Sequence, residues 1–149
     1  MNKVNQILHN LKEAGIPAYL FDVNEELAKK GKDALTSLKP APLYKPKNAD
    51  LVTPCTYDND LEKIAEVDWV LEAVVERLDI KESVYQSLLH HLKESAILTS
   101  NTSGIPLNDL TKSLPDEVKQ RFMITHFFNP PRSMQLLELV RGNETSDET

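Results

Sequence analysis

The 149-residue chain carries a formal net charge of −6, with 40% hydrophobic and 27% charged residues. This excess of acid over base argues against a nucleic-acid or anionic-membrane surface, because both attract clustered Lys and Arg. The length suits one domain with one core, since a chain of this size buries roughly 68–70% of the surface that it exposes when unfolded.

Cysteine usage and the N-terminal segment predict the compartment. Cys55 is the single cysteine, so no internal disulfide forms, and without metal-ligand spacing around it a reduced, intracellular setting is the default. Residues 1–15 lack the apolar run of a signal peptide, and no later run approaches the ~20 apolar residues of a membrane span. We therefore expect a soluble, cytoplasmic protein without a metal site or a membrane partner.

The sequence opens with a predicted helix followed by a strand. Apolar residues at helical spacing, ending before Gly15, predict a helix over residues 2–14. The short apolar run 18–21 has no helical period and predicts a strand that ends at Asp22. Asn24 can then cap a second helix.

The middle of the chain alternates between extended segments and helices. Its prolines predict an extended connection over residues 39–54, in which we expect a short strand at 51–52. The apolar run 69–75 is rich in β-branched and aromatic residues and predicts a buried strand. The spacing of Asp79 and Glu82 predicts a capping box at the start of the next helix.

The last third of the chain predicts three further strands. Short apolar runs predict strands at 96–99, 122–125 and 136–140, and Pro106 fits the first turn of a helix between the first two. Strands separated by helices of ~10–15 residues are typical of an α/β fold with a doubly wound, mostly parallel sheet.

Polar residues gather where the predicted strands end, which is where an open α/β sheet keeps its ligand sites. His126 is the natural general base, because imidazole titrates near neutrality and a carboxylate such as Glu138 can hold its other nitrogen. Ser103 and Asn101 could hydrogen-bond a substrate oxygen. Each residue also has a simpler interpretation: a histidine beside two phenylalanines packs in many cores, and Asn-Thr-Ser-Gly is ordinary turn chemistry.

Asp22 lies where a dinucleotide-binding fold places an acid that accepts hydrogen bonds from ribose hydroxyls. An aspartate that merely turns the chain fits the sequence equally well. The same fold uses a glycine-rich turn one helix earlier, because only glycine lets the backbone approach the pyrophosphate. The sequence has four glycines and no G-x-G, so spacing alone leaves the function open.

Several short motifs, in their order and spacing, resemble the NAD-binding domain of L-3-hydroxyacyl-CoA dehydrogenases. They are Ala14-Gly15-Ile16-Pro17, Phe21-Asp22-Val23, Glu72-Ala73-Val74-Val75-Glu76, Ser100-Asn101-Thr102-Ser103, and His126-Phe127-Phe128-Asn129-Pro130 followed by Leu137-Glu138. The resemblance implies a Rossmann-like domain over residues 1–142 and a polar tail over 143–149. The proline-rich segment 39–43 resembles bacterial members with a longer insertion.

The resemblance also implies an activity, namely NAD-dependent oxidation of L-3-hydroxyacyl-CoA to 3-ketoacyl-CoA in fatty-acid β-oxidation. His126 would deprotonate the 3-hydroxyl as hydride leaves C3 for the nicotinamide, and Glu138 would orient the imidazole. Ser103 would bind the reacting oxygen near the cofactor. The implied cofactor contacts are Asp22 at the adenosine ribose, Glu76 and Lys81 at the nicotinamide ribose, Asn129 at the carboxamide, and Asn101 and Ser103 beside them.

Members of this family open with a strand and a G-x-G-x-x-G turn and continue into a helical domain, and the sequence matches neither part. We therefore expect a sheet that lacks its first strand, with either a gap beside residues 18–21 or a re-paired sheet. Two alternatives remain: an inactive fragment or one piece of a split enzyme, and another NAD-dependent hydroxy-acid dehydrogenase. The chain could form a homo-oligomer or take the missing elements from a complementing chain.

Overall fold

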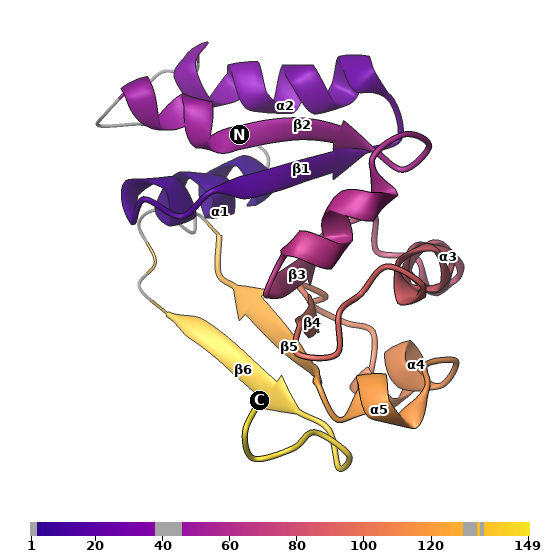
Figure 1. Cartoon of the computed structure of the whole chain (residues 1–149). Helices are drawn as coiled ribbons and strands as arrows, with labels where there is room; N and C mark the ends of the chain where they lie inside the picture. Colours follow the sequence, from indigo (N-terminus) through magenta and orange to yellow (C-terminus); the bar gives the residue numbers. More distant parts are fainter. Residues whose placement is uncertain (1–2, 38–45, 130–133, 135) are drawn as a thin grey trace. The chain divides into compact units, whose positions relative to one another are not determined.

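The computed structural model describes residues 3–37, 46–129, 134 and 136–149. The chain divides into two compact units, Met1–Leu61 with Phe128–Gln135 and Glu62–Phe127 with Leu136–Thr149. The first unit holds a two-stranded sheet and the second a four-stranded sheet. Each unit is described by itself below, and Figure 1 labels the elements of both.

The first unit combines a small parallel sheet with helices. Its elements are α1 (Lys3–Glu13), β1 (Ala18–Asp22), α2 (Glu25–Ser37), the 3-10 helix η1 (Pro46–Leu51) and β2 (Val52–Thr56). β1 and β2 pair in parallel along their whole length. Apolar side chains from both helices and both strands form the core, namely Leu8, Leu20, Leu35 and Val52.

Helix ends in this unit lie where the sequence predicts them. Gly15 has a φ of 77°, and its N–H bonds the carbonyl of Lys12 while the following N–H bonds that of Leu11. These two bonds form the Schellman motif that ends α1 and explain the glycine. At the other helix, Asn24 Oδ1 accepts the N–H of Leu27 at 2.9 Å, which confirms the predicted cap of α2.

The segment before β2 differs from the prediction of an extended connection over 39–54. Residues 38–45 lie outside the described part of the chain, η1 is helical, and β2 is longer than the short strand expected at 51–52. Pro54 lies within β2, opposite Leu20. Proline is tolerated there because β2 has one strand neighbour among the described residues, so its outer N–H groups are not needed for pairing.

The second unit is a four-stranded sheet with three α-helices. Its elements are the 3-10 helix η2 (Leu61–Glu66), β3 (Trp69–Glu72), α3 (Leu78–Leu89), β4 (Ile97–Ser100), α4 (Leu107–Thr111), α5 (Asp116–Lys119), β5 (Phe122–Phe127) and β6 (Leu137–Arg141). The strand order is β3-β4-β5-β6. The first three strands are parallel and β6 is antiparallel to β5. In Figure 1 the three α-helices gather on one side of this sheet. The predicted α/β class with a mostly parallel sheet is confirmed.

Two local predictions in this unit are wrong. The strand expected over 69–75 ends at Glu72, because the Glu72 side chain accepts the N–H of Val74 at 2.7 Å and turns the backbone out of the sheet. The capping box is also absent, since α3 begins after Arg77 without a side-chain cap. Asp79 instead pairs with Arg77 at 2.6 Å.

β1 pairs with β2 and β3 pairs with β4, and these are their only strand partners among the described residues. In the described ranges, every helix is too short or too polar to cross a bilayer.

Candidate active site

A buried polar cluster lies at the carboxyl end of β3. The Glu72 carboxylate, in a residue 3% exposed, accepts hydrogen bonds from Lys81 Nζ at 2.8 and 3.0 Å, from the Tyr85 hydroxyl at 2.9 Å and from the Ser100 hydroxyl at 2.6 Å. Burial, followed by the charge of Glu72, raises the pKa of the Tyr85 phenol, so this group stays a proton donor. A buried carboxylate is tolerated when it is paired and hydrogen-bonded in this way.

Glu76 lies between this cluster and the loop that follows β4. One of its carboxylate oxygens is 3.3 Å from Lys81 Nζ. The other accepts the Thr102 hydroxyl and the backbone N–H groups of Ser103 and Gly104, the last two at 3.1 Å. Desolvation by burial opposes ionisation, but these three hydrogen bonds and the Lys81 charge lower the pKa of Glu76 to about 2. The structure thus brings Glu76 and Lys81 together beside the Ser103 loop.

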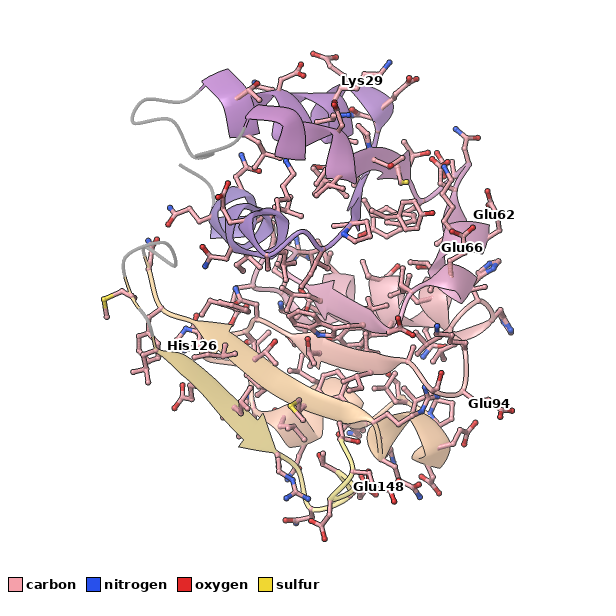
Figure 2. All side chains as sticks on the ribbon, turned by 60° about the vertical axis from the view of Figure 1, so that its left-hand side comes forward. Lys29, Glu62, Glu66, Glu94, His126 and Glu148 are labelled. Carbon is pink, nitrogen blue, oxygen red and sulfur yellow. The ribbon has the colours of Figure 1, made fainter. Side chains whose placement is uncertain are left out.

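His126 and Glu138 form the second polar pair. His126 Nδ1 lies 3.2 Å from Glu138 Oε2. The two residues are directly opposite each other in the antiparallel register of β5 and β6, so their side chains project from the same face of the sheet. The His126 side chain is 18% exposed and that of Glu138 is 55% exposed. Figure 2 shows His126 at the carboxyl-terminal end of β5.

One pocket is lined both by the loop that Glu76 contacts and by the pair of His126 and Glu138. It has a volume of about 240 Å³ and includes Ser103, His126 and Glu138 in its lining. The remaining lining is largely apolar and comes from the loop before α4, from the first residue of α4, and from β5 and β6, with Ile105, Pro106, Leu107, Ile124 and Val140 among the residues. The three side chains predicted to be catalytic therefore share a single pocket.

Asn101 has a bonding partner that its sequence position did not indicate. Its Oδ1 accepts the backbone N–H of Phe127 at 3.0 Å, and its own backbone N–H donates to the Glu72 carbonyl at 2.8 Å. The side-chain oxygen thus connects the end of β4 to the end of β5. The side-chain amide group remains as the donor that Asn101 could offer to a ligand.

Asp22 and Asn129 belong to the first unit. Asp22 lies at the carboxyl end of β1, as predicted, and its Oδ1 accepts the N–H of Val23 at 2.8 Å. This contact is the kind that an aspartate makes when it turns the chain. It occupies one of the two carboxylate oxygens of Asp22. Asn129 is exposed.

Sequence reasoning missed Glu72, Tyr85 and Ser100 as members of the site. A weak signal existed for Glu72, which is an acid within an apolar run, four positions before Glu76. Its partners come from α3 and β4, which are distant in sequence, so spacing gave no indication of the cluster.

Residues 5–149 match the family model described as 3-hydroxyacyl-CoA dehydrogenase, NAD binding domain. The chain belongs to this family. The resemblance predicted from the sequence motifs is therefore confirmed over nearly the whole chain.

Curated and solved members of the 3-hydroxyacyl-CoA dehydrogenase family support this assignment. The chain is 35% identical to the protein named Probable 3-hydroxyacyl-CoA dehydrogenase of Deinococcus radiodurans, covering 95% of this chain and 43% of the relative. It is also 35% identical to a protein of the same name from Bacillus subtilis, covering 97% of this chain and 18% of the relative. The chain thus spans less than half the length of either relative.

Two crystal structures of family members share the fold. The 3-hydroxybutyryl-CoA dehydrogenase from Escherichia coli is 25% identical with a TM-score of 0.83, covering 97% of this chain and 31% of that one. The (S)-3-hydroxybutyryl-CoA dehydrogenase from Ralstonia eutropha is 28% identical with a TM-score of 0.79, and the match covers 97% of this chain and 52% of that one. The described α/β units therefore correspond to a Rossmann-type NAD-binding domain.

Proposed function

We propose that this chain provides the catalytic centre of an NAD-dependent dehydrogenase that oxidises L-3-hydroxyacyl-CoA to 3-ketoacyl-CoA in fatty-acid β-oxidation. The observation that supports this most is the pocket that contains Ser103, His126 and Glu138 in a chain of this family. A base, its carboxylate partner and a hydroxyl donor are the groups that deprotonation of a secondary alcohol requires.

The proton pathway follows from the contact between His126 and Glu138. Because Nδ1 faces the carboxylate, Nε2 is the nitrogen that takes the proton of the 3-hydroxyl. Glu138 holds the ring and stabilises the imidazolium that forms. Ser103 donates a hydrogen bond to the reacting oxygen. NAD, when bound, accepts the hydride from C3.

Among the residues of the first unit, Asp22 would contact the adenosine ribose and Asn129 the carboxamide of the cofactor. On the second unit, Asn101 and Ser103 offer donors, and Glu76 offers carboxylate oxygens to the nicotinamide ribose. Glu76 fits this role because its side chain is 43% exposed. Lys81 is 1% exposed and enclosed by two carboxylates, so we assign it to holding Glu76 in place.

We also propose that a further strand, followed by a glycine-rich turn, pairs with the edge of β1 opposite β2 in the two-stranded sheet. β1 has β2 as its one strand partner among the described residues, and no G-x-G occurs in the sequence to cradle the pyrophosphate. Another segment or a complementing chain would supply this strand, and a homo-oligomer is a further possibility.

A second candidate function rests on length, since the chain spans 18% and 43% of the two curated relatives. In this case the chain is an inactive fragment or one piece of a split dehydrogenase. Another NAD-dependent hydroxy-acid dehydrogenase is the third candidate.

The experiment that separates these candidates measures NADH formation from L-3-hydroxybutyryl-CoA by absorbance. We expect turnover by the native chain, its loss in His126→Gln, and no change in His90→Gln, a matched substitution at an exposed residue outside the pocket. No turnover together with no NAD binding by calorimetry would support the fragment. Turnover of a free 3-hydroxy acid, but not of its CoA thioester, would support the third candidate.

A further inference from the structure

We propose that Glu72 is a positioning residue, whose buried carboxylate sets the conformation of the loop over residues 101–104. The loop carries Ser103, so the consequence for catalysis rests on the proposed function. The structural role of Glu72 does not depend on it.

The Glu72 side chain is surrounded by donors. Its contacts are the ammonium of Lys81, the hydroxyls of Tyr85 and Ser100, and the backbone N–H of Val74. A carboxylate suits this set because it is an acceptor only, whereas a glutamine of the same size would direct its own N–H₂ donor at other donors. Because Glu72 is 3% exposed, bulk water is not available to replace a lost contact.

One connection from Glu72 to the loop passes through Ser100. The Ser100 hydroxyl donates to Glu72 Oε2 at 2.6 Å and accepts the N–H of Thr102 at 3.2 Å. The Glu72 carbonyl accepts the N–H of Asn101 at 2.8 Å. Both the side chain and the backbone carbonyl of Glu72 therefore hold the first half of the loop.

A second connection passes through Lys81. Its ammonium lies 2.8 Å from Glu72 and 3.3 Å from Glu76. Glu76 in turn accepts the N–H groups of Ser103 and Gly104 at 3.1 Å. Without the Glu72 charge, Glu76 would be the remaining carboxylate near this buried ammonium and would be drawn toward it, away from the loop. Both connections therefore end on the backbone that presents Ser103.

The test is amide hydrogen exchange measured by NMR on the full chain. In Glu72→Gln we expect the amides of Ser103 and Gly104 to exchange about tenfold faster, relative to amides of α5 in the same unit. Trp69→Phe is the matched control, because it also removes one side-chain hydrogen bond within the sheet, to Thr99 at 2.8 Å, but lies on neither connection to the loop. We expect it to leave the Ser103 and Gly104 amides unchanged relative to α5.

A uniform increase across the second unit in Glu72→Gln, or no change at Ser103 and Gly104, would overturn the proposal. If Glu72→Gln does not fold, Ser100→Ala tests the first connection alone. Its Thr102 amide should exchange about tenfold faster, and an unchanged rate would count against a positioning role.

A kinetic measurement separates the two proposals. In a chain that turns over substrate, Glu72→Gln should lower kcat about tenfold at saturating substrate, whereas His90→Gln should not change it. An unchanged kcat beside altered loop exchange would show that Glu72 holds the loop without affecting the reaction. Absence of turnover in a native chain that binds NAD would contradict the dehydrogenase proposal while leaving the exchange result on Glu72 decisive.

Discussion

The side chain of Asn101 accepts the backbone N–H of Phe127 at 3.0 Å, at the ends of two neighbouring strands and one residue away from His126. This contact ties the loop that carries Ser103 to the strand that carries His126. We therefore expect Asn101→Ala to loosen the end of β5, with the Phe127 amide exchanging about tenfold faster in NMR measurements. Asn101→Asp retains an acceptor oxygen and should keep the Phe127 amide protected. Equal exchange in both variants would contradict this role.

Glu138→Gln should lower turnover by about 100-fold or more, because the imidazolium that forms at His126 loses its charged partner. The pair is partly exposed, and such pairs contribute only about 0–1 kcal/mol to stability. The free energy of unfolding should therefore change little. Turnover is followed by NADH absorbance, and Glu148→Gln in the exposed C-terminal segment is the matched control. A loss of stability that parallels the loss of activity would argue against a catalytic role.

Glu76 should make stability depend on pH in the acid range. Burial opposes the shift, but hydrogen bonds and Lys81 lower the pKa of Glu76 from 4.5 to about 2. The folded state therefore releases this proton more readily than the unfolded state. The stabilisation is present above about pH 4.5 and is lost as pH falls toward about 2. Because the side chain is 43% exposed, solvent screening keeps the effect small.

Urea unfolding, followed by fluorescence of the single tryptophan, Trp69, measures this dependence. Glu76→Gln should show a shallower loss of stability across the same pH range than the native chain. Parallel pH profiles for the two proteins would show that the carboxylate does not stabilise the loop.

Lys12 should produce a dependence of the same sign, with stability rising as pH rises, but in the alkaline range. Burial, then the charge of Lys32, lowers the pKa of Lys12 from 10.5 to about 8. In this interval the unfolded state binds the proton more tightly, so the free energy of unfolding should rise between about pH 8 and pH 10.5. Lys12→Met should flatten this rise, whereas Lys29→Met, at an exposed position, should not. Urea unfolding followed by circular dichroism provides the measurement, and an unaltered slope in Lys12→Met would refute the assignment.

Local signals in the sequence predicted several features of the fold correctly. The end of α1 at Gly15 and the cap of α2 at Asn24 depend on residues within one helical turn of each other, so spacing is sufficient to find them. Spacing and motif order also placed His126 and Glu138 together. The antiparallel direction of β6 was not foreseen. The segment between β5 and β6 is too short for a parallel crossover, which takes about a dozen residues or more.

Features that depend on tertiary contacts could not be predicted in this way. β3 ends at Glu72, whose side chain accepts the N–H of Val74 and is itself held by partners on α3 and β4. No periodicity in the run 69–75 reveals these distant partners. Pro54 indicated a break, yet it lies in a strand whose pairing leaves the missing N–H without consequence. Both errors concern residues whose conformation is decided by partners distant in the sequence.

The register of β5 and β6 has a consequence for changes in chain length. His126 faces Glu138 across the two strands, and a slip of one residue would turn the carboxylate to the other side of the sheet. A slip of two residues would place an aliphatic side chain, Leu136 or Val140, opposite the imidazole. Insertions and deletions in the segment between the strands therefore preserve the contact between His126 and Glu138 only when the loop absorbs them entirely and the pairing stays in place.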